Sequence, residues 1–416
     1  TTRCRDGSRH EPTAMRRRPV LGVGAVTAAI TLVLVLSLVS PGVPPTSHAS
    51  AGPSAQLGAT VRPTPPPKPG HETFGFLPYW EMTPAIADEV ARLDLTTLAL
   101  FSVTNARDGA VDTTQTGYKR ITGDLGKRLI REAHQRGIAV QLVYTSLSAA
   151  KNTRLFGSTT LQDATIGALV TFAGTIGVDG IDVDVEQLDG SLVPAYGAFI
   201  GRLREALHAK IPKAEVSVAT GAGRGGAAMA AAAATAGAER IVMQGYDYHY
   251  ASSDVGASAP MARRDGAEAS LPWSLDLYAS LGVPVERTIL ALPLYGMRWR
   301  VTGPEIGSPP LGNGAIWVPA DNPRFLASPP IPPMLDSLEV VEFYAVGPTV
   351  SPLPGDSRAT AGWQAIYVDS PRTLTPKLAL ADARGLAGAG FWAIGYSRGV
   401  AGYPDLIARF AAGKLD

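Results

Sequence analysis

Residues 179–186, Asp-Gly-Ile-Asp-Val-Asp-Val-Glu, constrain the fold of this chain more than any other segment. Apolar and acidic side chains alternate along it, which is the pattern of a β-strand with two different faces. Asp182, Asp184 and Glu186 therefore project from one face, with neighbours about 6–7 Å apart. The β-branched residues between them point the other way, into a packed layer. The segment predicts a buried strand with an acidic face.

The three acids lie close enough to compete for protons. Like charges at this spacing cannot all stay ionised, and the group in the driest position should hold a proton near neutral pH. A strand buried on both faces normally carries apolar residues on both, so three acids on one face indicate chemistry rather than packing. A protonated carboxylic acid beside a carboxylate is the pair that glycosidases use. The segment therefore predicts hydrolysis of a glycosidic bond.

Other interpretations of the same segment stay open. An acidic strand can be a solvated sheet edge, although the β-branched residues opposite and the small-residue lead-in over 174–180 fit that poorly. An Asp-x-Asp stretch can also bind a metal, as in a calcium loop or a metal-dependent glycosyltransferase. A calcium loop of the EF-hand type requires a turn-forming Gly at its sixth position, where this segment has Gln187.

The composition fits one large domain with a tail, and it argues against nucleic-acid binding and against a metal site. The chain has 416 residues, and an α/β barrel commonly uses about 250 or more. The formal net charge is +1, so no basic surface predicts nucleic-acid binding. The one cysteine, Cys4, lies outside the predicted domain, and the histidines have no metal-ligand spacing. We expect no metal and no cofactor.

The pattern of residues 15–40 is typical of a targeting segment. Three arginines follow Met15, and an apolar run then extends to about residue 39. The segment is either a secretory signal peptide or an N-terminal membrane anchor, because its apolar run approaches the length of a membrane span. In both cases the arginines stay inside and the rest of the chain is exported. We expect it to be secreted, or anchored to the outer face of the cytoplasmic membrane or the cell wall.

The residues on either side of this segment are expected to form no packed core. Residues 1–14 are polar and lack a pattern, so they are expected to be unstructured. Residues 41–71 are rich in Pro, Ser and Ala, and they are expected to form a semi-extended linker.

Residues 72–414 alternate short apolar runs with helical stretches, which is the order of a parallel sheet. The expected strands are 73–79, 97–103, 138–144, 180–186, 215–219, 240–246, 288–293 and 390–394. Helical periodicity is visible at 125–136, 161–176, 193–209 and 376–384. This order favours an α/β fold, a closed (β/α)8 TIM barrel. Residues 302–363, dense in Pro and Gly, are expected to be an insertion between strands 7 and 8 at one rim of the site.

The C-terminal ends of the predicted strands collect aromatic residues. In such a barrel these ends carry the chemistry, and Tyr79, Tyr295 and Trp392 all lie there. Sugar rings stack on aromatic surfaces, while carboxylates and amides bind their hydroxyls. Any one of these aromatics alone would more often be packing, but together they predict a carbohydrate site.

The acidic segment resembles the Asp-Gly-x-Asp-x-Asp-x-Glu signature of glycoside hydrolase family 18, the chitinase-like enzymes, at every specified position. Other stretches are similar to family segments as well. They are Tyr246-Asp247 on the sixth strand, Pro-Leu-Tyr-Gly at 293–296, and the Gly-rich approach to Trp392. The likeness covers about residues 74–410. Residues 366–396 most resemble the branch that includes spore-cortex-lytic and other bacterial cell-wall enzymes.

The chain departs from the family pattern at Gln244. With Tyr246-Asp247 aligned, Gln244 stands where relatives have a Met that lines the pocket floor, and Met243 is one place away. We therefore include Gln244 among the substrate-binding candidates.

The resemblance implies a role for each acid of the segment, which would be the fourth barrel strand. Glu186 would protonate the glycosidic oxygen and later activate water. The nucleophile would be the oxygen of the substrate's own N-acetyl group, which forms an oxazolinium ion. Asp184 would orient the acetamido N–H and stabilise that cation, and Asp182 would share a proton with Asp184. This is substrate-assisted hydrolysis with retention.

The resemblance also implies how the sugar is held. Tyr246 would hydrogen-bond the acetamido carbonyl, and Trp392 would form a hydrophobic floor under the ring. Asp247 is expected to bind a hydroxyl, and Tyr295 and Tyr79 are further substrate-binding candidates.

The implied partner is a β-linked polysaccharide that contains N-acetylglucosamine, either a chitin-type oligomer or peptidoglycan glycan. No nucleic acid is expected, the membrane is expected only through the N-terminal segment, and the chain is expected to be a monomer. Two other classes stay open, because a fold alone does not prove activity. One is a non-catalytic, lectin-type carbohydrate-binding protein, in which the catalytic Glu is usually replaced. The other is a wall-anchored sugar sensor.

Overall fold

The computed structural model describes residues 70–347 and 362–415. The chain divides into two units, Thr1–Thr64 and Pro65–Asp416, and the described residues belong to the second. The predicted signal or anchor segment and nearly all of the linker lie outside the described residues. Within them, no helix has the length and apolar character needed to cross a membrane.

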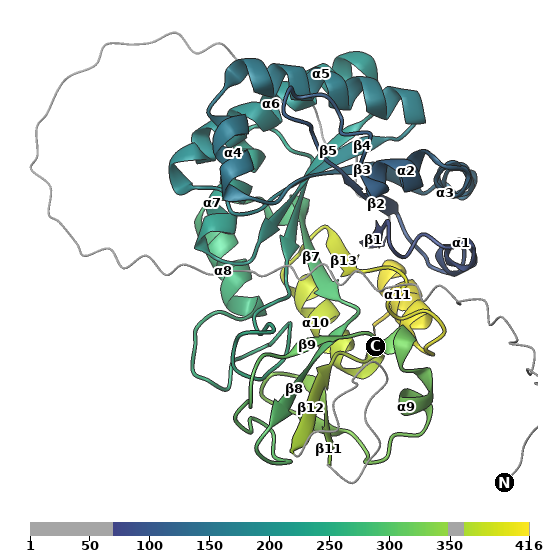
Figure 1. Ribbon diagram of the computed structural model, residues 1–416, viewed down its shortest axis with the longest axis vertical. Coiled ribbons are helices and arrows are strands. Elements are labelled where there is room, and N and C mark those ends of the chain that lie inside the picture. Colours follow the sequence, from purple (N-terminus) through teal and green to yellow (C-terminus); the bar gives the residue numbers. More distant parts are fainter. Residues whose placement is uncertain (1–69, 348–361, 416) are drawn as a thin grey trace, which may run out of the picture. The chain divides into compact units, whose positions relative to one another are not determined.

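Eight parallel strands close into a barrel, with the order β1-β13-β7-β6-β5-β4-β3-β2 around the ring. The closed ring confirms the predicted (β/α)8 TIM barrel (Figure 1). The barrel strands are β1 Glu72–Pro78, β2 Thr97–Val103, β3 Ala139–Ser146, β4 Gly180–Val185, β5 Glu215–Gly221, β6 Arg240–Gln244, β7 Thr288–Pro293 and β13 Gly388–Trp392.

Helices connect the strands and cover the outside of the barrel. They are α1 Pro84–Val90, α2 Thr116–Thr122, α3 Asp124–Gln135, α4 Ala149–Phe156, α5 Thr159–Ile176, α6 Val193–Lys210, α7 Arg224–Thr235, α8 Leu271–Ser280, α10 Pro371–Ala383 and α11 Tyr403–Ala411. Local signals set their ends. Ser158 accepts a hydrogen bond from the Leu161 amide at the start of α5, and Gly177 ends that helix with φ 73°.

The sequence prediction placed the start of α10 too late. Residues 376–384 were expected to be helical, with Pro376 at the first helical position. The helix instead begins at Pro371, because Ser370 and Thr373 form a capping box before that proline, and Pro376 lies inside the helix.

A five-stranded antiparallel sheet, the inserted sheet, lies between β7 and β13 in the chain. Its order is β10-β11-β12-β8-β9, with short α9 (Pro323–Ala327) beside it. The strands are β8 Gly296–Val301, β9 Ala315–Trp317, β10 Met334–Asp336, β11 Val341–Val346 and β12 Trp363–Val368. The predicted bounds 302–363 were wrong at both ends. The sheet already begins at β8 and ends with β12, and these two strands pair with each other although they lie far apart in sequence.

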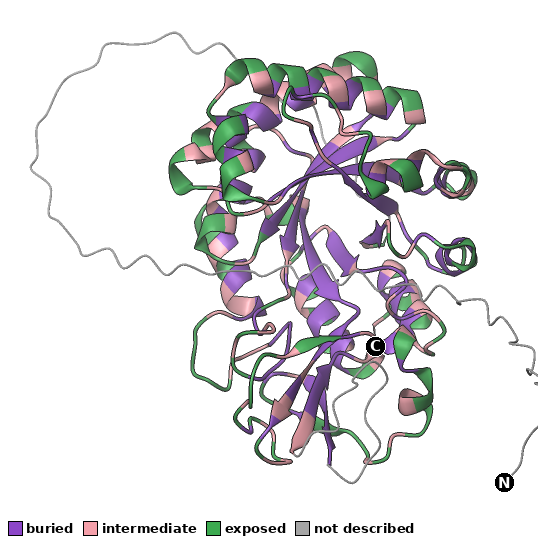
Figure 2. Cartoon of the chain, in the orientation of Figure 1, coloured by how far each residue is buried: buried purple, intermediate pink, exposed green. Residues whose placement is uncertain are grey.

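The barrel strands separate two apolar layers, as their alternation predicts. On β4, Ile181, Val183 and Val185 pack in the layer between strands and helices. Residues of the opposite faces, among them Phe74 on β1 and Val143 on β3, form a smaller cluster inside the barrel. Figure 2 shows the strands buried and the outward faces of the helices exposed. The acidic face of β4 therefore points into the barrel interior.

Candidate active site

Strand β4 places two of its acids inside the barrel, toward the end where the strands finish. Asp182 stands between Val143 and Ser217 of the neighbouring strands, and Asp184 stands between Thr145 and Ala219. Both acids are buried, and neither has a cation within ion-pair distance among the described residues. The predicted acidic face is thus present at the C-terminal mouth of the barrel.

Asp182 is held by a short polar chain. The Ser217 hydroxyl lies 2.5 Å from Asp182 Oδ1 and 2.6 Å from Gln141 Oε1. A hydroxyl has one proton, so it donates to only one of these oxygens at a time. When Asp182 is ionised Ser217 donates to it, and when Asp182 is protonated it can donate to Ser217, which then donates to Gln141. Burial raises the pKa of Asp182 from 3.8 to about 6 although the Ser217 hydrogen bond acts to lower it, so Asp182 gains and loses its proton at mildly acidic pH.

The surroundings of Asp184 and Glu186 also favour the protonated forms of these acids. Burial raises the pKa of Asp184 well above its ordinary value, and the nearby charges of Glu186 and Asp182 raise it further. The Gln244 amide, 3.4 Å from Asp184 Oδ1, acts in the opposite direction. Burial and the charge of Asp247 raise the pKa of Glu186. The carboxyls therefore share protons as a group near neutral pH, and Glu186 can serve as an acid.

The pKa of Asp182 predicts a pH-dependent stability difference. An acid whose pKa is raised by folding favours the folded state below its unfolded pKa, and this contribution is lost as pH rises through the folded pKa. We expect Asp182→Asn to gain about 2 kcal/mol in unfolding free energy relative to the unsubstituted chain between pH 4 and pH 7, since one pKa unit is worth about 1.4 kcal/mol and the unfolded acid is already partly ionised at pH 4. Urea unfolding at several pH values measures the difference.

The same comparison for an exposed acid, Asp108→Asn, reports the effect of removing a surface charge. A difference between Asp182→Asn and the unsubstituted chain that stays constant from pH 4 to pH 7 would contradict the raised pKa.

Glu186 follows the last residue of β4 and is held by its backbone. The Asn152 amide donates to the Glu186 backbone oxygen, and the Ser146 hydroxyl, 2.6 Å away, donates to Asn152 Oδ1. The next residue, Gln187, has φ 56°, so the chain turns sharply away from the strand direction there. The Glu186 side chain is half-buried at the mouth.

Trp392 at the end of β13 forms an aromatic cluster beside the acids. Its ring centre lies 4.9 Å from Phe101, 6.3 Å from Phe76 and 6.2 Å from Trp80. Trp80 is 42% exposed, and its indole N–H donates to the Tyr396 hydroxyl over 3.0 Å. The cluster provides an apolar floor with an exposed aromatic edge.

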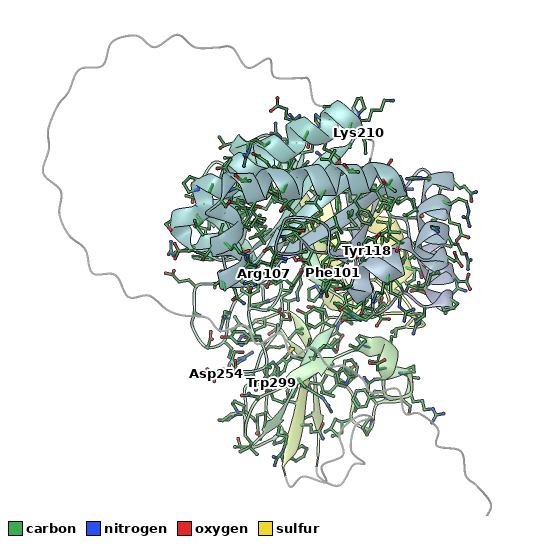
Figure 3. All side chains as sticks on the ribbon, turned by 45° about the horizontal axis from the view of Figure 1, so that its top comes forward. Phe101, Arg107, Tyr118, Lys210, Asp254 and Trp299 are labelled. Atoms are coloured by element: carbon green, nitrogen blue, oxygen red, sulfur yellow. The ribbon has the colours of Figure 1, made fainter. Side chains whose placement is uncertain are left out.

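A pocket joins the acids to this apolar floor. It is lined by Phe76, Phe101, Val143, Asp182, Asp184, Ala219, Val242, Gln244, Tyr246 and Trp392. Five of the predicted site residues, Asp182, Asp184, Gln244, Tyr246 and Trp392, are therefore gathered around one small space. Figure 3 shows Phe101 on the side of the barrel nearest to Trp299 of the inserted sheet.

Tyr295 supports Asp247 from behind. The Tyr295 ring is buried and packs edge-on against Tyr246, with the ring centres 6.3 Å apart. Its hydroxyl donates to Asp247 Oδ1, and the Asp247 amide donates to Ser258 Oγ over 3.0 Å. Asp247 itself is exposed, at φ 59°. The structure thus places Asp247 at the mouth of the barrel, and the buried Tyr295 holds the Asp247 carboxylate from the protein side.

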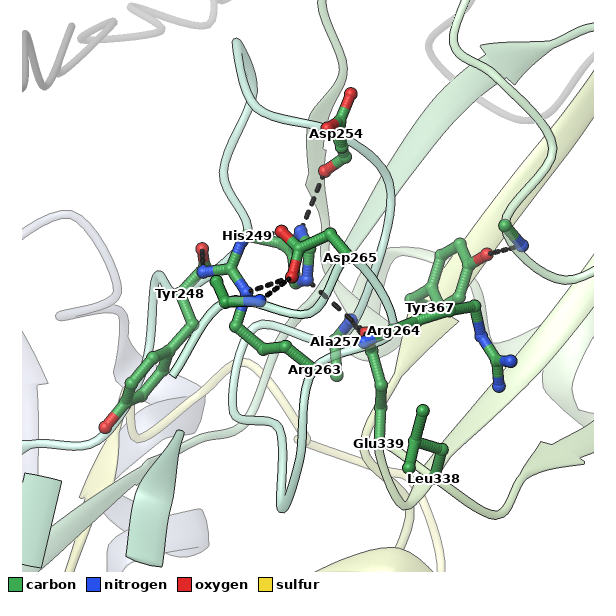
Figure 4. A network of polar contacts seen from close by, with 12 residues as sticks. Tyr248, His249, Asp254, Ala257, Arg263, Arg264, Asp265, Leu338, Glu339 and Tyr367 are labelled. Carbon is green, nitrogen blue, oxygen red and sulfur yellow. Dashed lines mark hydrogen bonds and ion pairs between the residues drawn. The ribbon is translucent and has the colours of Figure 1, made fainter. Parts of the chain in front are cut away.

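The loop that carries Asp247 is fixed to the inserted sheet by a buried acid, Glu339. The Ala257 and Arg264 amides donate to its carboxylate over 2.6 and 3.0 Å, and His249 Nε2 lies 3.5 Å away (Figure 4). The Arg264 guanidinium pairs with buried Asp336 at the end of β10. These contacts hold the loop after β6 in place although it has no regular structure near Asp247.

Tyr79 does not line the pocket. The strand alternation that puts Phe74 and Phe76 inside the barrel turns Tyr79 outward, where it packs against the layer under the helices. The adjacent Trp80 lies on the inner side instead and contacts Trp392. Substrate binding by Tyr79 stays a prediction, and Trp80 is the residue of this segment that contacts the aromatic floor. The period-two pattern distinguishes the two positions.

Several supporting residues were not predicted from the sequence. Phe101 could have been found, because it lies at the end of a predicted strand in the inward register. Ser217, Gln141 and Asn152 are single polar residues in apolar strands or on a helix, and no local pattern marks them. Within residues 70–347 and 362–415, no group of three or more His, Cys, Asp or Glu side chains is arranged to hold a metal ion.

Comparison with known proteins gives a family and a set of similar structures. The sequence model of glycosyl hydrolases family 18 matches residues 144–397. A comparison with curated proteins found no matching sequence.

The structure resembles several solved structures at low sequence identity. The spore cortex-lytic enzyme SleL of Bacillus cereus is 17% identical, with a TM-score of 0.63, covering 82% of this chain and 74% of that one. A Cycas revoluta family GH18 chitinase in complex with allosamidin is 16% identical, with a TM-score of 0.67 over 83% of this chain and all (100%) of that one. A Group IV chitinase of Ostrinia furnacalis is 15% identical, with a TM-score of 0.68 over 83% and 99%. At this identity the likeness supports the fold.

Proposed function

The chain belongs to glycosyl hydrolase family 18 and is a glycosidase, and we propose that it cleaves β-linked polysaccharides containing N-acetylglucosamine by a substrate-assisted, retaining mechanism. The observation that carries this proposal is the row of Asp182, Asp184 and Glu186 beside the pocket over Trp392. The pKa values of all three acids are raised, so the row can hold and release protons near neutral pH.

In the first step Glu186 acts as the general acid. The acetamido carbonyl oxygen of the substrate attacks the anomeric carbon while the bond to the leaving oxygen breaks, and Glu186 gives that oxygen its proton. The product is an oxazolinium ion that carries the positive charge. Asp184, ionised at this stage, accepts a hydrogen bond from the acetamido N–H and stabilises the cation.

Asp182 and Tyr246 support this step. When Asp182 takes up a proton, the repulsion that Asp184 meets on ionising falls, because two like charges so close resist ionisation together. Tyr246 lines the pocket and stays protonated, since burial and the surrounding acids raise its pKa. Its hydroxyl therefore donates to the acetamido oxygen and holds it for attack, a proximity effect worth several kcal/mol.

In the second step water attacks the anomeric carbon from the face that the leaving group has left, opposite the acetamido oxygen. Glu186, now ionised, takes a proton from that water, and the oxazolinium ring opens to restore the N-acetyl group. Two displacements at one carbon retain the β configuration. Trp392 provides the floor on which the sugar ring rests.

The mechanism predicts that the acetamido group is required. An oligomer with free amines at the cleaved sugar lacks the nucleophilic carbonyl, so we expect its turnover to fall below 1% of that of the acetylated oligomer, since an aligned nucleophile can be worth about 7–11 kcal/mol. Reducing-end release from chitotetraose and from fully deacetylated chitotetraose measures the ratio. Comparable turnover of both would rule out substrate assistance.

We propose that the polymer is either chitin-type or peptidoglycan glycan, and that the chain meets it outside the cytoplasm. The structurally similar proteins support both polymers, since one is named a spore cortex-lytic enzyme and others are named chitinases. The basic and apolar residues of segment 15–40 support export, either free or membrane-anchored. The full chain would then act as a monomer on the polymer in the cell envelope.

The test of the proposed function is turnover by the full chain. We expect it to release reducing ends from chitotetraose or from peptide-free peptidoglycan glycan. Oligomer binding detected by calorimetry without any release would instead identify a lectin-type carbohydrate-binding protein. Gln244 would then be the first residue to exchange, because its amide bonds to Asp184.

A further inference from the structure

Lys151 lies at the mouth of the barrel, on the side opposite the inserted sheet. It belongs to the first turn of α4, which follows the C-terminal end of β3. In the closed ring of strands β3 stands across from β7, and the inserted sheet follows β7 in the chain. A polysaccharide that places one sugar in the pocket would lie across this end of the barrel.

The Lys151 ammonium is anchored at the ends of β2 and β3, and β3 is the neighbour of the acidic strand β4. It donates to Thr104 Oγ1, and the Thr104 hydroxyl donates to the Thr145 backbone oxygen over 2.6 Å. Thr145 is the register partner of Asp184. The next residue along α4, Asn152, holds the Glu186 backbone. The ammonium is therefore held at the rim, and its sequence neighbour Asn152 contacts the backbone of the proposed catalytic acid.

This ammonium has no carboxylate partner in the part of the chain that the structure describes. Asp112 is the acid that acts on it, but the Asp112 carboxylate is exposed and already accepts hydrogen bonds from Thr114 and Gln115. Arg154, one turn further along α4, repels it. Burial and Arg154 together lower the pKa of Lys151 to about 8. A half-buried cation in these surroundings gains from any anion that binds beside it.

We propose that Lys151 binds a carboxylate of the substrate and so favours N-acetylhexosamine polymers whose sugars carry carboxylates. In peptidoglycan glycan from which the peptides have been removed, every second sugar carries a lactyl ether with a free carboxylate, whereas chitin is uncharged. The inference deepens the proposed function and rests on it, since it assumes that a glycan lies across this mouth. The bond formed is a charge-assisted one between an ammonium and a carboxylate.

The experiment measures binding rather than turnover, in the full chain carrying Glu186→Gln so that the ligand stays uncut. One ligand is a peptide-free tetrasaccharide of alternating N-acetylglucosamine and N-acetylmuramic acid, and the other is its methyl ester. Calorimetry gives both dissociation constants. We expect the free acid to bind about tenfold more tightly than the ester. Lys151→Gln should reduce this ratio of the ester's dissociation constant to that of the free acid to about one.

Two further variants separate charge from structure. Lys151→Arg keeps the cation and should keep most of the ratio, and Lys127→Gln removes an exposed lysine of α3 and should keep all of it. A role of Lys151 only in holding Thr104 would weaken both ligands alike and leave the ratio unchanged on Lys151→Gln. That result, or equal binding of acid and ester before any substitution, would overturn the proposal.

A separate assay shows which of the two proposals has failed. Turnover is measured with the chain that retains Glu186. If the ratio of the two dissociation constants depends on Lys151 but no turnover is detected, the result would contradict hydrolysis and support the carboxylate site. Turnover with a ratio of one would support hydrolysis and overturn the carboxylate site.

Discussion

Glu186→Gln is expected to lower kcat on an N-acetylglucosamine oligomer by about 10²–10⁴-fold, the range that a positioned general acid contributes. The amide cannot give a proton to the leaving oxygen, but it has nearly the shape of the carboxyl. The contacts that place residue 186 are made by its backbone, through Asn152, and the substitution leaves them in place. We therefore expect the dissociation constant for chitotetraose to stay within about threefold, since the pocket and the aromatic floor are unchanged.

Glu205→Gln is a matched control, because it makes the same chemical change at an exposed position of α6. It should leave both kcat and binding unchanged. Full activity of Glu186→Gln would show that another group donates the proton and would contradict the roles proposed for the acidic strand.

The second large effect is expected on stability, at the buried pair of Lys377 and Asp369. The Lys377 ammonium donates to Asp369 Oδ1, and both side chains are at most 1% exposed. Thr373 also donates to this carboxylate, over 2.8 Å. Lys377→Met leaves a buried carboxylate without its cation, so we expect a loss of about 3–5 kcal/mol in the unfolding free energy.

The loss should come from the uncompensated charge and not from the shape of the side chain. A second substitution, Asp369→Asn, removes that charge and should restore part of the stability of Lys377→Met. Lys127→Met, at an exposed position of α3, is the control. Urea unfolding measures all four chains. A loss below 1 kcal/mol for Lys377→Met would mean that the pair is not buried as described.

The barrel could be predicted from the sequence because its strands carry their own signals. β2 and β7 have the predicted bounds, since apolar runs of that length between helical stretches leave little choice. The inserted sheet was different. β8 reads Gly-Met-Arg-Trp-Arg-Val, and its partner β12 comes more than sixty residues later, so its pairing has no local signature.

The candidate site divides in the same way. The acids of β4 follow from alternation within one strand. The chain of Gln141, Ser217 and Asp182 joins three different strands and exists only once the barrel closes. The different faces of Tyr79 and Trp80 are an intermediate case, because the alternation of β1 predicts them once the inward register of that strand is known.

The anomeric configuration of the first product tests the central claim most directly. Proton NMR during cleavage of a β-linked N-acetylglucosamine oligomer by the full chain distinguishes the β from the α reducing end before they equilibrate. Substrate assistance at Asp184 and Glu186 predicts that the β anomer appears first. The α anomer appearing first would mean direct attack by water and would contradict the proposed mechanism.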